Sequence, residues 1–419
     1  MSSTMGKQSI TRRRALKCMV AGVAGVAAGS RGGLGADRPA TRAASRPSAT
    51  GPVRWERQAT GAEIWQVTSE EFHQSNIYCE VPYCSGDGRY FVYERADPKL
   101  DSNRTELMVV ELGTWQQHRL DTAASISGCA ISPDGVFYYL KRTAGDELEL
   151  MRADLSKGTP EKVYRFRPGM LSGTLGTVSV DGRYYARGVR LDDQYKMFGI
   201  LLVDLQKGTE AIIDRDPCIF NAHPQFEPGP SQLLMIQHNR GGAYSPDGKR
   251  LRLVGPEGAT LYLLSVPAGQ RTELKVGKPH TTPATGHEAW IGQTGAILLS
   301  VSAHDDYAPE KGNLLRVRAH EPASVAARGY SFNHVGVSRC GRFFCCDDWR
   351  GTCKVVIGSL RTGRTAVVGE SRTSMGPAQN THPHAYLTPD LKWVIFNSDR
   401  SGFPHIHAAR VPEGMIDEL

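Results

Sequence analysis

The chain has 419 residues, of which 40% are hydrophobic and 22% are charged, and its formal net charge is +7. Nine lysines and arginines but only one acidic residue lie within the first 46 positions, so the rest of the chain is close to neutral. The basic balance therefore belongs to the N-terminal segment and gives no reason to expect nucleic-acid binding.

The N-terminus has the pattern of an export signal. Three arginines at positions 12–14 precede an apolar run from Cys18 to Ala28 that is rich in Ala, Gly and Val. This run is shorter than the ~20 apolar residues that span a bilayer, so we expect no membrane span in the mature form. We predict a twin-arginine signal over residues 1–36, a flexible tether over residues 37–55 and a periplasmic or secreted protein. The alternative is a cytosolic protein with a disordered basic tail.

Residues 56–419 carry a repeated signal of a turn followed by a strand. The turn is of the Ser-x-Asp-Gly type or a near variant, and the repeats follow one another at intervals of about 50 residues. They lie at residues 85–93, 132–140, 179–186, 227–235, 292–299, 338–344 and 388–396. Hairpin signals at this spacing, with almost no helical periodicity, are typical of four-stranded blades. We therefore predict an all-β fold, a seven-bladed β-propeller.

Two segments fall outside this repeat. The strand pattern of Glu63–Thr68 has no turn of its own before it, and we expect it to complete the last blade and close the ring. Closure removes the unpaired strand edge that an open ring would leave. The turn Ser245–Gly248 is out of phase with the other turns, so we predict that it lies in a loop and not in a blade.

Histidines gather where the repeat predicts the innermost strands. The strand before each turn lines the central channel of a propeller, and six of the thirteen histidines lie in or just before such strands: His73, His223, His287, His334, His382 and His384. His382 and His384 point to the same side if their segment is extended, and the amide oxygen of Gln379 could reach the same point. Imidazole nitrogens with one carbonyl oxygen suit a divalent metal such as manganese, iron or zinc. The alternative is that these histidines only form hydrogen bonds within the channel.

The segments around these histidines resemble the oligogalacturonate lyases, a family of seven-bladed propellers that act on short pectin fragments. The resemblance rests on the segments Gln379–His384 with its following Thr-Pro-Asp turn, Asn397–Asp399, Gly286–Trp290, Asn221–Phe226, His73–Asn76 and Asn333–His334. It implies a manganese(II) site made by His287, Gln379, His382 and His384, with His223 as the base. It also implies that His73, Asn76 and His334 lie at the substrate.

The implied reaction is β-elimination from a uronate. A base removes the C5 proton beside the C6 carboxylate, and the glycosidic oxygen at C4 leaves. A divalent cation on that carboxylate offsets the developing charge, and a neutral histidine is a suitable base.

One departure from the family concerns a catalytic arginine. The family carries it on a strand ahead of the base, but the corresponding stretch, Phe198–Val203, has none. Lys196, Arg190 or Arg240 could supply the positive charge, and the sequence does not choose among them. The sugar, the linkage and the length of the substrate stay open for the same reason.

We therefore predict a metal-dependent lyase acting on oligogalacturonate, with manganese as its cofactor and an oligosaccharide as its partner. The alternatives are a cell-envelope propeller that binds a protein or glycan without turnover, and a metal-dependent glycan hydrolase. The chain has no Gly-x-Ser-x-Gly elbow, no phosphate-binding loop and no dinucleotide fingerprint. The segment Asp347–Arg350 either reaches the channel mouth and binds sugar hydroxyls or forms a solvated turn.

Overall fold

The computed structural model describes residues 54–419 except residues 101–103, 146 and 168–173. The predicted signal and nearly all of the predicted tether therefore lie outside the described residues. Within the described part, β-strands and two short 3-10 helices, η1 (Asp305–Tyr307) and η2 (Gln379–Thr381), make up the regular structure. The described part contains no helix that is long and apolar enough to cross a membrane.

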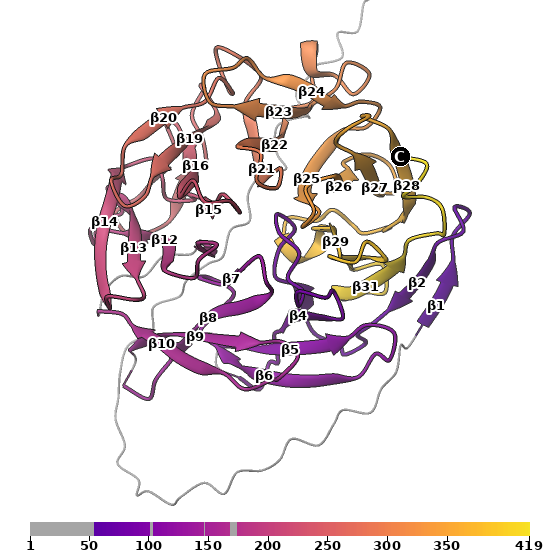
Figure 1. Cartoon of the computed structure of the whole chain (residues 1–419), viewed down its shortest axis with the longest axis horizontal. Coiled ribbons are helices and arrows are strands. Elements are labelled where there is room, and N and C mark those ends of the chain that lie inside the picture. The colour runs from indigo at the N-terminus through magenta and orange to yellow at the C-terminus, as the bar shows by residue number, and fades with distance from the viewer. Residues whose placement is uncertain (1–53, 101–103, 146, 168–173) are drawn as a thin grey trace, which may run out of the picture.

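The strands form antiparallel sheets arranged in a ring around a central axis (Figure 1). The first blade contains β3 (Gln74–Asn76), β4 (Tyr90–Arg95), β5 (Thr105–Glu111) and β6 (Gln117–Ala123). The second contains β7 (Ala130–Ile131), β8 (Val136–Arg142), β9 (Leu148–Asp154) and β10 (Glu161–Arg165). The third contains β11 (Gly176–Val178), β12 (Tyr184–Arg190), β13 (Phe198–Asp204) and β14 (Thr209–Asp216). The fourth contains β15 (Gln225–Phe226), β16 (Leu233–Asn239), β19 (Ala259–Ser265) and β20 (Arg271–Glu273). The fifth contains β21 (Ala284–Trp290), β22 (Ala296–Val301), β23 (Leu314–Arg318) and β24 (Ser324–Ala327). The sixth is β25 (Phe332–Val337), β26 (Phe343–Asp348), β27 (Lys354–Ser359) and β28 (Thr365–Glu370).

The last blade joins the two ends of the described chain. It contains β29 (Tyr386–Leu387), β30 (Trp393–Ser398), β31 (His405–Arg410), β2 (Glu63–Gln66) and β1 (Arg54–Arg57). Ile64 of β2 pairs with Ala409 of β31, which confirms that an N-terminal strand closes the ring. Strand β1 pairs with β2 and covers its outer edge, an addition that the sequence did not predict.

The predicted turns occur at the same place in every blade. Each of the seven turns leads into the second strand of a blade, from β4 to β30. The out-of-phase turn Ser245–Gly248 joins β17 (Ala243–Tyr244) to β18 (Arg250–Arg252), a separate two-stranded hairpin, so its prediction as a loop feature is confirmed.

The apolar core lies between neighbouring blades. Leu298 of β22 packs in one cluster with Phe344 of β26, and Phe91 of β4 packs in another with Ile395 of β30. Aliphatic and aromatic residues supply these contacts, and strands such as β5 and β13 are buried almost continuously, as expected for strands that bury both faces. Because this packing fixes each blade against the next, the inner strands are held where polar side chains from different blades can meet at the axis.

Candidate active site

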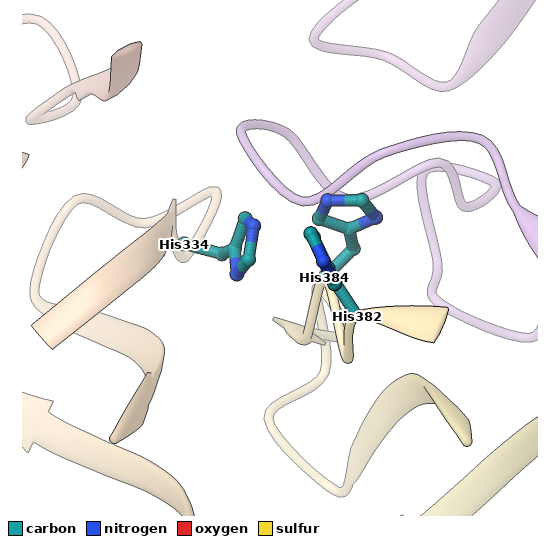
Figure 2. Close-up of side chains that lie close together, drawn as sticks. All are labelled: His334, His382 and His384. Carbon is teal, nitrogen blue, oxygen red and sulfur yellow. The ribbon is translucent and has the colours of Figure 1, made fainter. Parts of the chain in front are cut away.

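Four histidines from three inner-strand segments meet at the axis. The ring centroid of His334 on β25 lies 4.2 Å from that of His287 on β21, 4.4 Å from that of His384 and 5.2 Å from that of His382. One ring nitrogen each from His334, His382 and His384 lies within 4.8 Å of the others. Figure 2 shows His334 facing the other two from the opposite strand. We call these four residues the histidine cluster.

The cluster has the protonation state that metal ligands need. Burial, reinforced by the neighbouring imidazoles, lowers the pKa of His287, His334 and His384 well below its ordinary value, and burial also lowers the pKa of His382. The rings are therefore neutral at neutral pH, and neutral imidazole is the form that coordinates a metal. Nδ1 of His382 and Nε2 of His384 are buried without a hydrogen-bond partner in the described part. Unpartnered buried nitrogens are costly unless something binds them, so the cluster fits a divalent transition metal.

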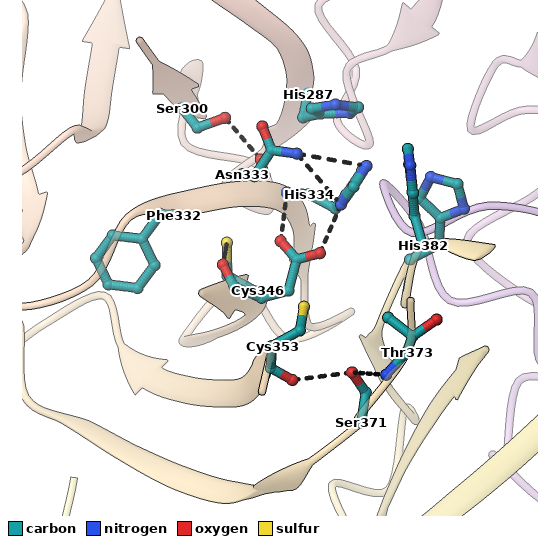
Figure 3. A network of polar contacts seen from close by, with 12 residues as sticks. His287, Ser300, Phe332, Asn333, His334, Cys346, Cys353, Ser371, Thr373 and His382 are labelled. Carbon is teal, nitrogen blue, oxygen red and sulfur yellow. Dashed lines mark hydrogen bonds and ion pairs between the residues drawn. The ribbon is translucent and has the colours of Figure 1, made fainter. Parts of the chain in front are cut away.

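A carboxylate fixes the tautomer of His334. Nδ1 of His334 donates to Oδ2 of Asp347 at 2.6 Å, and the backbone N–H of His334 donates to Oδ1 of Asp347 at 2.8 Å. Figure 3 shows His334 inside a wider polar network, where the Ser300 hydroxyl donates to the carbonyl of Asn333 at 2.6 Å. A histidine held in this way presents Nε2 to the cluster, an arrangement common around bound metals. The resemblance placed His334 at the substrate, whereas the geometry groups it with the candidate ligands.

His384 is held by two buried asparagines. Its backbone has a φ of 43°, in the left-handed region that non-glycine residues seldom adopt. The Asn76 side-chain amide donates to the His384 carbonyl at 2.7 Å, and Asn397 donates in turn to Oδ1 of Asn76 at 2.9 Å. The side-chain amide of Asn76 thus supports His384, and the predicted contact of Asn76 with substrate stays a prediction.

His382 and Gln379 are placed by the segment around η2. Nε2 of His382 donates to the Gly376 carbonyl at 2.8 Å, which leaves Nδ1 for the cluster. Gln379, the predicted oxygen ligand, begins η2 and is exposed. Its backbone carbonyl accepts the N–H of His382 at 3.0 Å. The role of the Gln379 side chain as a metal ligand stays a prediction.

His223 lies in a second group that has carboxylates in place of histidines. Nδ1 of His223 donates to Oε1 of Glu80 at 2.7 Å, and Gln225 donates to Oε2 of Glu80 at 2.7 Å. Burial alone would lower the pKa of His223, but the charge of Glu80 outweighs burial and raises that pKa to about 9. Burial raises the pKa of Glu288, whose carboxyl lies within 4.8 Å of the other two groups. The Glu80 bond leaves Nε2 of His223 available to take a proton.

Tyr78 connects the two groups. Its hydroxyl shares a hydrogen bond of 3.0 Å with Nδ1 of His287. Its ring centroid lies 4.7 Å from that of His384 and 5.7 Å from that of His223. His223 and the candidate ligands His287 and His384 therefore contact the same tyrosine at the axis.

The other predicted residues lie apart from these groups. His73 is exposed and bonded to Asn380. Arg240 donates to the carbonyls of Gly258, Lys278 and Glu257 at 2.8–3.0 Å, so it braces a loop. Arg190 contacts Asp193 and the Tyr195 ring, and Lys196 is exposed. Among the described residues, no hydrogen bond or ion pair joins these three cations to either histidine group.

Sequence reasoning missed five residues that support the site: Tyr78, Glu80, Glu288, Asp347 and Asn397. Glu288 and Asn397 stood in segments that carry the resemblance, but without roles of their own. Asp347 stood in a segment considered for binding sugar hydroxyls and not for orienting a histidine. Glu80 and Tyr78 follow the innermost strand of the first blade, and no local motif marks them.

Comparison with known proteins decides the family. No protein-family model matches the chain. An oligogalacturonate lyase of Dickeya dadantii is 38% identical over 391 residues, which cover 86% of this chain and 96% of the relative. The chain belongs to the oligogalacturonate lyase family. A second relative, an oligogalacturonide lyase of Pectobacterium atrosepticum, is 24% identical over 325 residues, 69% of this chain and 78% of the relative.

Solved structures of oligogalacturonate lyases share the fold. One, in complex with manganese, has a TM-score of 0.67 at 18% identity and covers 86% of this chain and 96% of its own. Another, from Vibrio parahaemolyticus, has a TM-score of 0.64 at 18% identity and covers 86% and 97%. The propeller predicted from the repeats is therefore confirmed, and the family predicted from the histidine segments is confirmed by the sequence relative.

Proposed function

We propose that this protein cleaves short oligogalacturonates by β-elimination and uses one manganese(II) ion as its cofactor. The observation that carries the proposal is the histidine cluster: four neutral, converging imidazoles, two of them with buried nitrogens that lack a protein partner. Membership in the oligogalacturonate lyase family and the manganese complex of a protein with the same fold support this choice of substrate and metal.

The residues that would hold the ion are His382, His384 and His334, with His287 beside them. The chemistry that such an ion supplies is neutralisation of the substrate carboxylate next to C5. Asp347 holds His334 in one tautomer, and Asn76 holds the segment of His384. These contacts set the ring orientations before any ligand arrives, which lowers the cost of binding.

His223 is the residue that takes the proton. Glu80 accepts the Nδ1 proton of His223, orients the ring and raises its basicity, so that Nε2 can remove the proton from C5 of the uronate. The electrons of the broken C–H bond form the C4–C5 double bond, and the C4–O bond breaks with its electron pair on the glycosidic oxygen. That oxygen takes up a proton from solvent and becomes the hydroxyl of the released sugar. Tyr78, placed between His223 and His287, closes the side of the space where the proton moves.

We also infer that the protein is exported through the twin-arginine route. The three arginines at positions 12–14 and the apolar run after them support this. Replacing Arg12 and Arg13 together by lysine is expected to retain the full-length precursor in the cytoplasm. Cell fractionation tests the inference, and unchanged export of the double variant would refute it.

The test of function is turnover of unsaturated and saturated digalacturonate. Protein is dialysed against chelator, measured with and without added manganese, and compared with His382→Ala. Manganese-dependent formation of a keto-uronate, absent from the variant, is the expected result. Saturated products without any unsaturated or keto-uronate product would favour a hydrolase. Absence of both turnover and stoichiometric metal would favour the binding propeller.

A further inference from the structure

An exposed tryptophan lies against the histidine cluster. Trp349 follows β26 and is 37% exposed, although it is one of the largest apolar side chains. Its ring centroid lies 4.9 Å from that of His382, nearly perpendicular at 82°, and 5.2 Å from that of His334. The indole therefore contacts two candidate ligands while it keeps part of its surface open to solvent.

The backbone of this segment is pinned in place. The N–H of Trp349 donates to the Ser331 carbonyl at 2.8 Å, and the N–H of Ser331 donates to Oδ1 of Asp348 at 2.9 Å. Arg350 donates to both carboxylate oxygens of Asp348, at 2.8 and 3.1 Å. The adjacent Asp347 is the residue that orients His334. These contacts fix the backbone that carries Trp349, and the rings of His382 and His334 pack against the indole, which lowers the cost of ordering it for a ligand.

The exposed indole has a surface suited to a sugar acid. A pyranose ring presents an apolar face of C–H groups, and aromatic side chains supply large, rigid contact area for such faces. The next residue, Arg350, pairs its guanidinium with Asp348 and keeps 48% of its side chain exposed. The open face of the indole is therefore the feature that matches the C–H face of a sugar ring.

We propose that Trp349 is the stacking platform for the uronate ring bound at the histidine cluster. This inference rests on the proposed function, because the ligand is the substrate assigned there. Trp349 acts by holding the sugar ring while the cluster holds the ion and His223 takes the proton. The residue therefore sets substrate affinity and contributes little to the chemical step.

The kinetic test uses Trp349→Ala and Trp349→Phe in manganese-loaded protein. The alanine variant is expected to raise KM for digalacturonate about tenfold or more, in the range of buried aromatic contacts in interfaces, with kcat changed much less. The phenylalanine variant keeps an aromatic face and should stay within a few-fold of the wild-type KM. Manganese affinity and the melting temperature serve as the readouts for damage to the cluster or the fold, and neither should change appreciably in the phenylalanine variant.

The binding test uses tryptophan fluorescence. In a manganese-loaded His223→Ala background, which prevents turnover, saturated digalacturonate should change the emission. That change should disappear in Trp349→Phe and persist in Trp55→Phe, because Trp55 is a 51% exposed tryptophan on the outer strand β1. Loss of the signal together with the KM effect supports the platform.

The outcomes separate the two claims. If wild-type protein turns over digalacturonate but Trp349→Ala keeps the wild-type KM, or if Trp349→Phe keeps the fluorescence change, the platform is wrong and the proposed function stands. If wild-type protein neither binds nor cleaves galacturonate oligomers, the proposed function is wrong and the platform falls with it. If Trp349→Ala weakens manganese binding and leaves KM unchanged at saturating metal, Trp349 is a cover for the cluster and not a sugar platform.

Discussion

The two sides of the channel affect histidine in opposite ways. At the histidine cluster, burial lowers the pKa of each ring, and neighbouring imidazoles lower the pKa of His287, His334 and His384 further. At His223, the buried carboxylate of Glu80 raises the pKa to about 9. Tyr78 contacts rings on both sides, so the two environments adjoin. The same side chain is thus suited to bind a metal in one place and to hold a proton in the other, because its partner differs.

The largest expected effect follows from removal of a cluster histidine. His384→Ala should abolish stoichiometric manganese binding and reduce turnover roughly 10³-fold or more, since the charge stabilisation by a metal is worth several kcal/mol. Metal content after gel filtration and the rate of keto-uronate formation measure the two effects. His280→Ala, which removes an exposed histidine elsewhere, should change neither quantity. Full metal content in His384→Ala would remove His384 from the ligand set.

Removal of the base should separate chemistry from metal binding. His223→Ala should lower kcat by about 10²–10⁴-fold, the usual contribution of a general base, and leave manganese binding unchanged. Isothermal titration with manganese beside steady-state kinetics makes the comparison. A fall in manganese affinity to the level of His384→Ala would show that the two sides are not independent and would contradict the division of roles.

A smaller effect is expected when a residue behind a ligand is changed. In Asp347→Asn, the remaining oxygen must accept the backbone N–H of His334, so the new NH₂ group faces Nδ1 and reverses the tautomer. Manganese affinity should fall about 10–100-fold, as for other residues behind metal ligands. Asp390→Asn is the matched control, because Asp390 accepts the Thr388 hydroxyl and the Lys392 N–H within a turn and contacts no histidine of the cluster in the described part. If Asp347→Asn binds manganese with unchanged affinity, His334 is not a metal ligand, and its predicted place at the substrate is favoured.

Periodicity explains why the sequence predicted the fold and the position of the histidines. The turn repeat fixes which strand of each blade is innermost, and so places His382 and His384, just before β29, near the axis. The extended segment assumed for these two residues is not observed, since His382 caps η2 and His384 has a φ of 43°. Closure by β2 followed from the absence of a turn before Glu63. These inferences used local pattern only, and the propeller repeats that pattern around the ring.

The partners of the histidines could not be predicted in the same way. Glu80 reaches His223 across blades, at a separation of 143 residues. Asp347 meets His334 where the register of β25 and β26 shifts, so simple alternation does not pair them. The resemblance implied that Asn76 lies at the substrate, whereas its burial and its bond to Asn397 depend on tertiary packing. Local pattern therefore indicated the histidines that converge at the axis, and packing determines which groups set their protonation.

The smallest expected effect concerns the pH dependence of kcat/KM, which tests the contrast between His223 and the histidine cluster. The protonated form of His223 cannot act as a base, so activity should rise with pH towards the pKa of His223. Because Glu80 raises that pKa to about 9, roughly one in a hundred His223 rings is neutral at pH 7 before an ion binds. A bound cation favours the neutral ring, so the rise in the loaded enzyme should lie below pH 9.

Glu80→Gln should move this rise to lower pH. The glutamine keeps an oxygen for the Nδ1 proton of His223 but lacks the negative charge that raises its pKa. At the pH plateau the variant should be slower than wild type, because the ring is less basic and less firmly oriented. Below the wild-type rise the deficit should shrink, because a larger fraction of the variant carries a neutral base. A rise at unchanged or higher pH would mean that Glu80 does not set the charge of His223, and the contrast between the two sides of the channel would then need another cause.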